Sequence, residues 1–338
     1  MKKIITGVIV SILIVALAVT ISYVFKVHGE ESESTWSSSD TYSIENVPSL
    51  MMNENEDFKI LVLSDLQLNI LSPSRNKKAL DLTENLIEEQ SPDFVITTGD
   101  NVSLIYQGFL VKQLVRKLES LDVLWAVTLG NHDSEASVDR NWHGNIYENA
   151  GNCLFEMGPV EVDGVGNYQI NIENSEGNII QSLIMLDSHA KTKYEDGRDY
   201  DHIHQNQLDW YEWVTEGMEK ATGDKIPSML FFHIPLIEFD EAINDSDTVI
   251  LFGEKNEGVY SAPVSSGLFE LIIEQGSTTH IFNGHDHINN LSVLYKGIQM
   301  TYGTKTGPTS YSSRNIQGGT LITIKSDNYE IVVEHLYH

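Results

Sequence analysis

The sequence predicts an α/β protein in which helices cover a parallel sheet and a second sheet is stacked on the first. Between residues 58 and 131, three apolar strand patterns alternate with helical patterns. This order is typical of parallel strands joined by crossover helices. The C-terminal half is richer in strand patterns than in helical ones, which predicts the second sheet.

An uncharged apolar run precedes the globular part. Residues 4–25 carry no charged side chain and are long enough to cross a bilayer core of about 30 Å. Because Lys2 and Lys3 precede this run, we expect a single-pass signal-anchor at the cell membrane, with residues 1–3 in the cytoplasm and the remaining chain outside it. A cleaved signal peptide, which would leave a secreted protein, is the alternative.

Two further regions follow the apolar run. Residues 26–55 are rich in Ser and Glu, a composition that predicts a flexible linker. Residues 56–338 are predicted to form one catalytic domain, because strand and helix patterns continue through them without a long low-complexity interruption.

The first half of the domain supplies the strand–helix units. Buried strands are predicted over 58–65, 93–100 and 123–131, and helices over 75–90 and 109–121. In the second of these helices, Leu110, Leu114 and Leu118 recur at helical spacing and define one apolar face.

The second half supplies mainly strands. A hairpin is predicted around the turn 174–178, and a helix over 205–220. Further strands are predicted over 228–233, 279–284, 290–303, 319–325 and 329–336.

The charge balance restricts the partners. The chain has 21 Lys and Arg against 49 Asp and Glu, a net charge of -28, which disfavours binding of nucleic acid over a wide face. Bound divalent cations would offset part of this charge. The only cysteine is Cys153, so no disulfide framework is expected. Nothing in the sequence requires an obligate protein partner.

Polar side chains end each of the first three strands. Asp65 ends the first strand, Asp100 the second, and Asn131-His132-Asp133 follows the third. A single aspartate at a strand end is as consistent with a helix cap as with a ligand-binding residue. Three in succession favour a ligand site, because ligands bind beyond the carboxyl ends of such strands.

Two later strands end in histidines. His233 follows one, and His285 and His287 follow the other. Residues two apart in an extended chain project to the same side, so His285 can converge with His287, and Asp65 with Gln67. Oxygen and imidazole donors together predict a metal site.

The order of these blocks is D-x-Q, G-D, G-N-H-D, H and G-H-x-H. It resembles the calcineurin-like metallophosphoesterase superfamily, whose blocks run D-x-H, G-D, G-N-H-[DE], H and G-H-x-H. The resemblance extends from Asp65 to His287. Residues 200–214 also resemble the Gln-x-x-Trp helix start of short purple-acid-phosphatase-like members.

The resemblance implies a four-layer α/β/β/α sandwich that holds two metal ions, divalent or mixed-valence Mn, Fe or Zn. It implies hydrolysis of a small-molecule phosphate monoester by a metal-bound hydroxide. By this pattern Asp100 bridges both ions, and His132 lies beside them without binding. The remaining implied ligands are Asp65 and His287 for the first metal, and Asn131, His233 and His285 for the second.

Gln67 stands where most of the superfamily has a ligating histidine. One interpretation is that its amide oxygen completes the first metal site as a weaker ligand. Another is that it points elsewhere and water takes the position. A third is an inactive site. The tyrosine that purple acid phosphatases place three residues after the bridging aspartate is Ser103 here, so no tyrosinate colour is expected.

Three further roles are predicted. His132 is a candidate for stabilising phosphate charge or protonating the leaving group. Asp133 is expected either to orient His132 or to cap a loop. His189 ends a strand and is a candidate substrate contact. The alternative functions are a phosphodiesterase acting on cyclic nucleotides or envelope phosphodiesters, and a non-catalytic envelope binding protein that retains the fold.

Overall fold

The computed structural model describes residues 26–338. The membrane-spanning segment predicted over 4–25 lies outside these residues. Within the described part of the chain, no helix is both long enough and apolar enough to cross a bilayer.

The first sheet has five strands in the order β15-β14-β2-β3-β4. Its strands β2, β3 and β4 are parallel, as the sequence predicts. The strand bounds are β2 (Phe58–Leu63), β3 (Phe94–Thr98), β4 (Leu124–Thr128), β14 (Gly318–Ile324) and β15 (Ile331–Tyr337). The connecting helices are α2 (Pro73–Gln90) and α3 (Gln107–Glu119).

One sheet assignment from the sequence is wrong. The two C-terminal strands were expected in the second sheet, but β14 pairs antiparallel with β2 and β15 pairs with β14. An apolar pattern identifies a strand without identifying its neighbour. Here β14 occupies the edge of β2 that β3 leaves open, and β15 adds to the outer edge of β14.

The second sheet has eight strands in the order β1-β5-β6-β9-β11-β13-β12-β10. The predicted hairpin is present as the antiparallel pair β5 and β6. The strands are β1 (Ser49–Met51), β5 (Tyr168–Glu173), β6 (Ile179–Met185), β9 (Ser228–Phe231), β10 (Val249–Phe252), β11 (Thr278–Asn283), β12 (Ser292–Tyr295) and β13 (Ile298–Tyr302). A separate small hairpin comprises β7 (Lys191–Tyr194) and β8 (Gly197–Tyr200).

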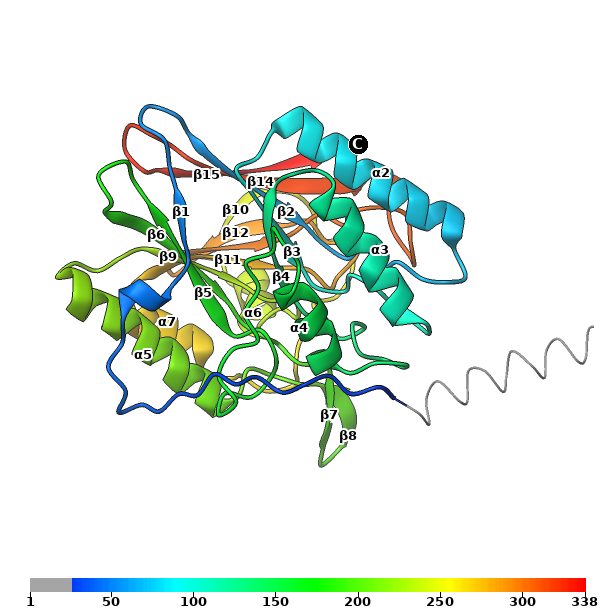
Figure 1. Cartoon of the computed structure of the whole chain (residues 1–338), viewed down its shortest axis with the longest axis horizontal. Coiled ribbons are helices and arrows are strands. Elements are labelled where there is room, and N and C mark those ends of the chain that lie inside the picture. The colour runs from blue at the N-terminus through cyan, green and yellow to red at the C-terminus, as the bar shows by residue number, and fades with distance from the viewer. Residues whose placement is uncertain (1–25) are drawn as a thin grey trace, which may run out of the picture.

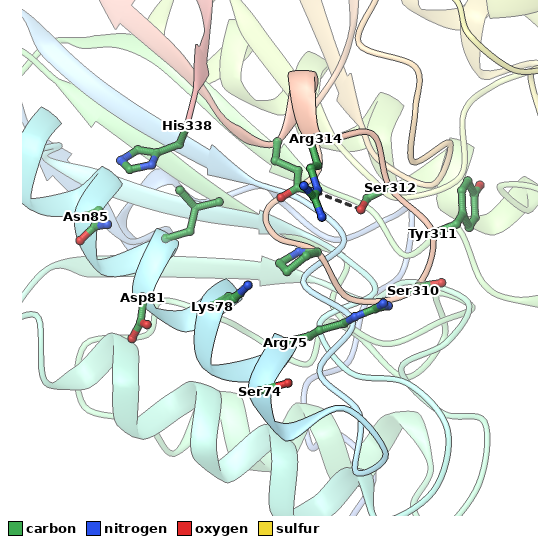
Figure 2. A pocket seen from close by; sticks show the side chains of 13 residues that line it. Ser74, Arg75, Lys78, Asp81, Asn85, Ser310, Tyr311, Ser312, Arg314 and His338 are labelled. Atoms are coloured by element: carbon green, nitrogen blue, oxygen red, sulfur yellow. Dashed lines mark hydrogen bonds between the residues drawn. The ribbon is translucent and has the colours of Figure 1, made fainter.

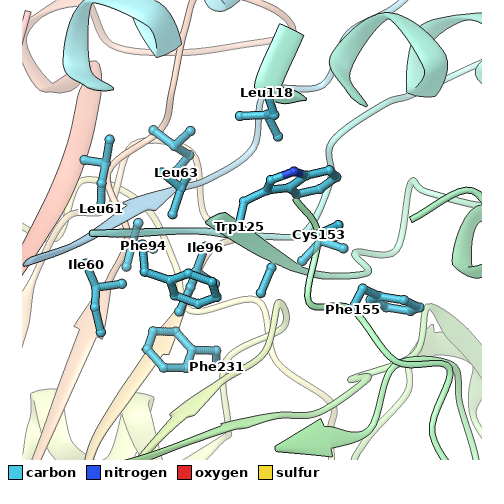
Figure 3. Close-up of a cluster of buried hydrophobic side chains, with 14 of the residues drawn as sticks. Ile60, Leu61, Leu63, Phe94, Ile96, Leu118, Trp125, Cys153, Phe155 and Phe231 are labelled. Carbon is cyan, nitrogen blue, oxygen red and sulfur yellow. The ribbon is translucent and has the colours of Figure 1, made fainter. Parts of the chain in front are cut away.

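The two sheets pack face to face between helices. Ile60 and Phe94 of the first sheet face Phe231 of the second, while Leu61 and Leu63 point the opposite way, towards the helices (Figure 3). A second core lies between the far face of the eight-stranded sheet and its helices, and includes Leu208 and Phe269. Those helices are α5 (Gln205–Thr222), α6 (Glu238–Asn244) and α7 (Leu268–Gln275), and α4 (Arg140–Glu148) lies near α3 (Figure 1).

Residues 26–55 differ from the flexible linker that their composition predicts. β1 pairs in parallel with β5 and extends the eight-stranded sheet, and Leu50 is buried in the core. Trp36 and Tyr42 pack edge-on against Trp213 of α5. A few apolar side chains hold this segment against the domain. The prediction was based on the mean composition of the segment, which is polar and does not reveal them.

Candidate metal centre

The predicted ligands gather at the carboxyl ends of β2, β3, β4, β9 and β11. The loops after these strands carry them to one place between the two sheets. Asp65, Gln67, Asp100, His233, His285 and His287 are buried, and Asn131 and His132 are half-buried.

Two clusters of donor atoms share one carboxylate. In the first, donor atoms of Asp100, His233 and His285 all lie within 4.8 Å of one another. In the second, the same limit holds for Asp65, Asp100 and His287. Asp100 therefore stands where a carboxylate bridging two cations would stand.

The separations between donor atoms fit a bound cation. His233 Nε2 lies 3.3 Å from Asp100 Oδ2, and His287 Nε2 lies 3.4 Å from Asp65 Oδ1. Tetrahedral ligands at about 2.0–2.1 Å from zinc are about 3.3 Å apart. Asn131 Oδ1 and Gln67 Oε1 are buried with no hydrogen-bond donor among the described residues, an unfavourable state that a cation would relieve.

The backbone at the site adopts an uncommon conformation. Asp65, Asp100 and His285 have φ angles of 54°, 51° and 79°, in the left-handed region that non-glycine residues rarely occupy. Each costs on the order of 1–3 kcal/mol, and such residues concentrate at functional sites.

Two glycines allow the close approach. A Cβ on Gly130 would lie 2.2 Å from Asp100 Oδ1, and one on Gly284 would lie 2.6 Å from Asp65 Oδ2. The glycines of the G-N-H-D and G-H-x-H blocks thus leave room for the two carboxylates.

The electrostatics of the site keep both carboxylates ionised. Burial would raise the pKa of Asp100, but the charges of His233 and His132 outweigh it and hold that pKa well below its usual value. Burial opposes protonation of His233, yet Asp100 raises the pKa of His233 to about 9. Burial and the neighbouring His233 lower the pKa of His285 to about 3.

Comparison with known proteins decides the family. Residues 58–289 match the family described as calcineurin-like phosphoesterase. The chain belongs to this family.

Individual proteins with similar sequences or folds are also phosphatases by name. The chain is 29% identical over 301 residues to "Probable inactive purple acid phosphatase 29" of Arabidopsis thaliana, covering 78% of this chain and 75% of the relative. It is 28% identical to "Phosphatase DCR2" of Saccharomyces cerevisiae, over 71% of this chain and 46% of the relative. A dimetal phosphatase from Danio rerio shares the fold, with a TM-score of 0.52 and 11% identity over 82% of this chain and 98% of that one.

In this calcineurin-like phosphoesterase, Glu135 positions His132. His132 Nδ1 lies 2.5 Å from Glu135 Oε1, and its Nε2 lies 3.8 Å from Asp100 Oδ2. The charge of Asp100 raises the pKa of His132 to about 9, with Glu135 acting in the same direction. The sequence analysis missed Glu135, although a carboxylate three residues after the block histidine was the available signal.

Asp133 caps a loop and does not orient His132. Its Oδ2 accepts a hydrogen bond of 2.8 Å from the Gly130 backbone N–H, and its Oδ1 accepts one of 2.9 Å from the Val102 N–H. Burial raises the pKa of Asp133 to about 6. Of the two roles predicted for Asp133, the geometry matches the cap. Asp133 Oδ2 also accepts from Asn101 Nδ2 at 3.4 Å, and no hydrogen bond joins Asp133 to His132 among the described residues, so the geometry does not support the orienting role.

Gln67 lies within the centre. Its Nε2 donates a 2.9 Å hydrogen bond to Asp100 Oδ2. The side chain thus points into the centre with its amide nitrogen directed at Asp100. Coordination through its amide oxygen stays a prediction.

His189 is not part of the cavity over the centre. Its Nε2 lies 2.8 Å from Gln207 Oε1, and its ring stacks on His204 with centroids 4.2 Å apart. These contacts indicate a structural role next to the Arg140–Asp187 ion pair, where Arg140 also donates to the His189 carbonyl. A contact between His189 and substrate stays a prediction.

The cavity over the centre holds about 350 Å³. Its aromatic walls are close to the ligands: the Tyr311 ring stacks on His287 at 4.1 Å, and the Tyr200 ring meets His285 edge-on at 4.5 Å. The lining comprises Asp100, His132, Tyr200, Glu257, Tyr260, His285, Asp286, His287, Ser310 and Tyr311. No sequence motif announced these tyrosines.

A buried cation also adjoins the centre. Lys305 is 1% exposed and its Nζ donates a 2.5 Å hydrogen bond to the Asp65 carbonyl. Burial lowers the pKa of Lys305 to about 8. The sequence analysis missed this residue, which lies in a Gly- and Thr-rich stretch.

Proposed function

We propose that this protein is a dinuclear metal-dependent phosphoesterase that hydrolyses small phosphate monoesters. The observation that carries the proposal is the sharing of Asp100 between two clusters of donor atoms. A pair of cations held by these two clusters would stabilise charge on both the attacking and the leaving oxygen of an in-line displacement.

The chemistry divides between the metals and the chain. When bound, two Mn, Fe or Zn ions would neutralise phosphate charge and supply a nucleophile at neutral pH. His132 lines the cavity and, held through Nδ1 by Glu135, presents Nε2 as a proton donor for the leaving alkoxide. The site requires no covalent phosphoenzyme. Burial raises the pKa of the Cys153 thiol above its usual value, which leaves it a poor nucleophile.

The proposal includes attachment to a membrane through residues 4–25, with the catalytic domain outside the cytoplasm. The uncharged run after Lys2 and Lys3 supports this arrangement. Membrane fractionation of the full-length protein, followed by protease digestion of intact cells, tests it. Protection of the domain in intact cells would reject the orientation.

One observation favours a second function, a non-catalytic envelope binding protein. Gln67 occupies a position that is histidine in most of the superfamily, and a neutral amide is a weaker ligand than imidazole. The name of the Arabidopsis relative also contains the word "inactive".

Metal content and turnover on one sample distinguish these functions. Full-length protein is loaded with Mn, Fe or Zn, analysed for metal, and assayed with p-nitrophenyl phosphate and bis-p-nitrophenyl phosphate. We expect two metals per chain, faster turnover of the monoester, and loss of turnover in Asp100→Ala and His132→Ala. Faster diester turnover would indicate a phosphodiesterase, and absence of turnover with either ester would indicate the binding protein.

A further inference from the structure

A second and larger cavity lies beside the metal centre. It holds about 970 Å³ and is lined on one side by residues 74–85 of α2 and on the other by residues 308–317, with His338 also at its wall. Figure 2 shows Arg75 and Lys78 on α2 opposite the segment that carries Ser310 and Arg314. We call this cavity the basic pocket.

The basic pocket concentrates positive charge in an acidic protein. Arg75, Lys78 and Arg314 all line it, although the chain as a whole carries a net charge of -28. Within residues 26–338, no carboxylate oxygen lies within 4.0 Å of the charged nitrogens of these three side chains. Asp81 also lines the pocket, but Lys77 lies 2.7 Å from it and offsets its charge.

The pocket adjoins the cavity over the metals. Ser310 and Tyr311 line both spaces, and the Tyr311 ring stacks on His287, a candidate ligand. A small molecule that spans Ser310 and Tyr311 would place one end at the metal centre and the other among the three cations.

We propose that the basic pocket binds a second phosphate of the substrate, so that the preferred substrates are small bisphosphorylated molecules. This inference depends on the proposed function, because the scissile phosphate is the one at the metals. Arginine presents a planar fork of donors that matches phosphate oxygens, and lysine adds a point charge. Arg75 and Arg314 supply two such forks, and Lys78 supplies the point charge. Ser310, which also lines the pocket, adds a hydroxyl.

The test compares matched esters. The full-length, metal-loaded protein is assayed with α,ω-alkanediol bisphosphates of increasing chain length and with the corresponding alkyl monophosphates. We expect kcat/KM for the bisphosphates to exceed that for the monophosphates by about tenfold or more, since hydrogen bonds to charged groups are the stronger class. One chain length should be optimal, and added salt should reduce the preference.

One double variant tests the pocket, and a single variant elsewhere on the surface serves as its control. Arg75→Gln combined with Arg314→Gln should abolish the bisphosphate preference and leave monophosphate kinetics unchanged. Lys220→Gln removes the same kind of charge from an exposed side chain of α5 that does not line the pocket, and should leave the preference intact. An equal loss for both ester classes in the double variant, or no preference in the wild type, would overturn the proposal.

Failure of the proposed function gives a different result. If no ester is turned over, calorimetric titration of the wild type and the double variant with the same bisphosphate still measures the pocket. Binding by the wild type that the double variant lacks supports an anion site without catalysis. Equal binding, or none, rejects the pocket itself.

Discussion

His285 Nδ1 lies 3.2 Å from His233 Nε2, although the two residues are 52 positions apart in the chain. Both imidazoles are buried, and both belong to the cluster around Asp100. Two buried nitrogens that face one another at this distance share at most one proton. Asp100 raises the pKa of His233 against the effect of burial, whereas burial and then the charge of His233 lower the pKa of His285. A cation bound by both nitrogens removes the conflict.

The first prediction concerns this histidine pair. His233→Ala and His285→Ala should each lower the metal content from two ions per chain to one or fewer, because the second site loses an imidazole ligand. Elemental analysis of the purified full-length variants measures this. His280→Ala removes a histidine that lies in β11, the strand before His285, and outside both clusters, so it should retain both ions. Two ions in His233→Ala would contradict the assignment.

The second prediction concerns Gln67. Gln67→His should tighten binding of the first metal by on the order of tenfold, a change of only about 1.4 kcal/mol, because imidazole is a better ligand than an amide for zinc or iron. Competition with a metal chelator measures the affinity. An unchanged metal affinity would show that the side chain at position 67 does not reach the first metal.

The third prediction separates two neighbouring carboxylates. Glu135→Gln should lower kcat by about tenfold, part of the 10²–10⁴-fold that a positioned acid supplies, and leave KM and metal content unchanged. Asp133→Asn should instead lower the free energy of unfolding by about 1–3 kcal/mol, because the carboxylate caps buried backbone donors. Steady-state kinetics and chemical denaturation measure the two effects, and exchanged phenotypes would reverse the roles.

The fourth prediction concerns the N-terminal strand. Leu50 of β1 is 4% exposed and its neighbour Met51 is 55% exposed. Leu50→Ala should lower the free energy of unfolding by about 2–5 kcal/mol through loss of buried apolar contact, whereas Met51→Ala should change it little. Urea denaturation measures both. Equal effects would mean that residues 49–51 are a linker and not part of the sheet.

The fifth prediction concerns pH. Burial lowers the pKa of His143 to about 3, whereas an unfolded histidine has a pKa of about 6.5. Below about pH 6.5 the unfolded chain binds a proton that the folded chain does not, so stability is lost as the pH falls from 6.5 towards 3. At pH 5 the loss from this residue is about 2 kcal/mol.

His143→Leu removes that proton uptake. The fall in melting temperature between pH 7 and pH 5 should therefore be smaller in His143→Leu than in the wild type. Calorimetry at both pH values measures the difference. An identical fall in the two proteins would place the acid sensitivity elsewhere.

The local patterns of apolar residues predicted much of the strand arrangement. The parallel order of β2, β3 and β4 and the hairpin of β5 with β6 match the predictions, because alternating strand and helix patterns and a short turn restrict the partners of those strands. The sheet that holds β14 and β15 was not predicted, since β14 pairs with β2, more than two hundred residues earlier in the chain, and no local signal encodes that pairing.

The sequence by itself determined which side chains end the strands, and therefore that Asp65, Asp100, His233, His285 and His287 would meet at one edge. Only the tertiary structure decided their use. In the folded protein Asp133 accepts from backbone donors, and the side chain that holds His132 is Glu135. It also brought Lys305 and Tyr311 to the centre from a distant segment. Strand ends fix where a residue's backbone lies, but the side chains that a residue meets depend on how loops far apart in the chain pack together.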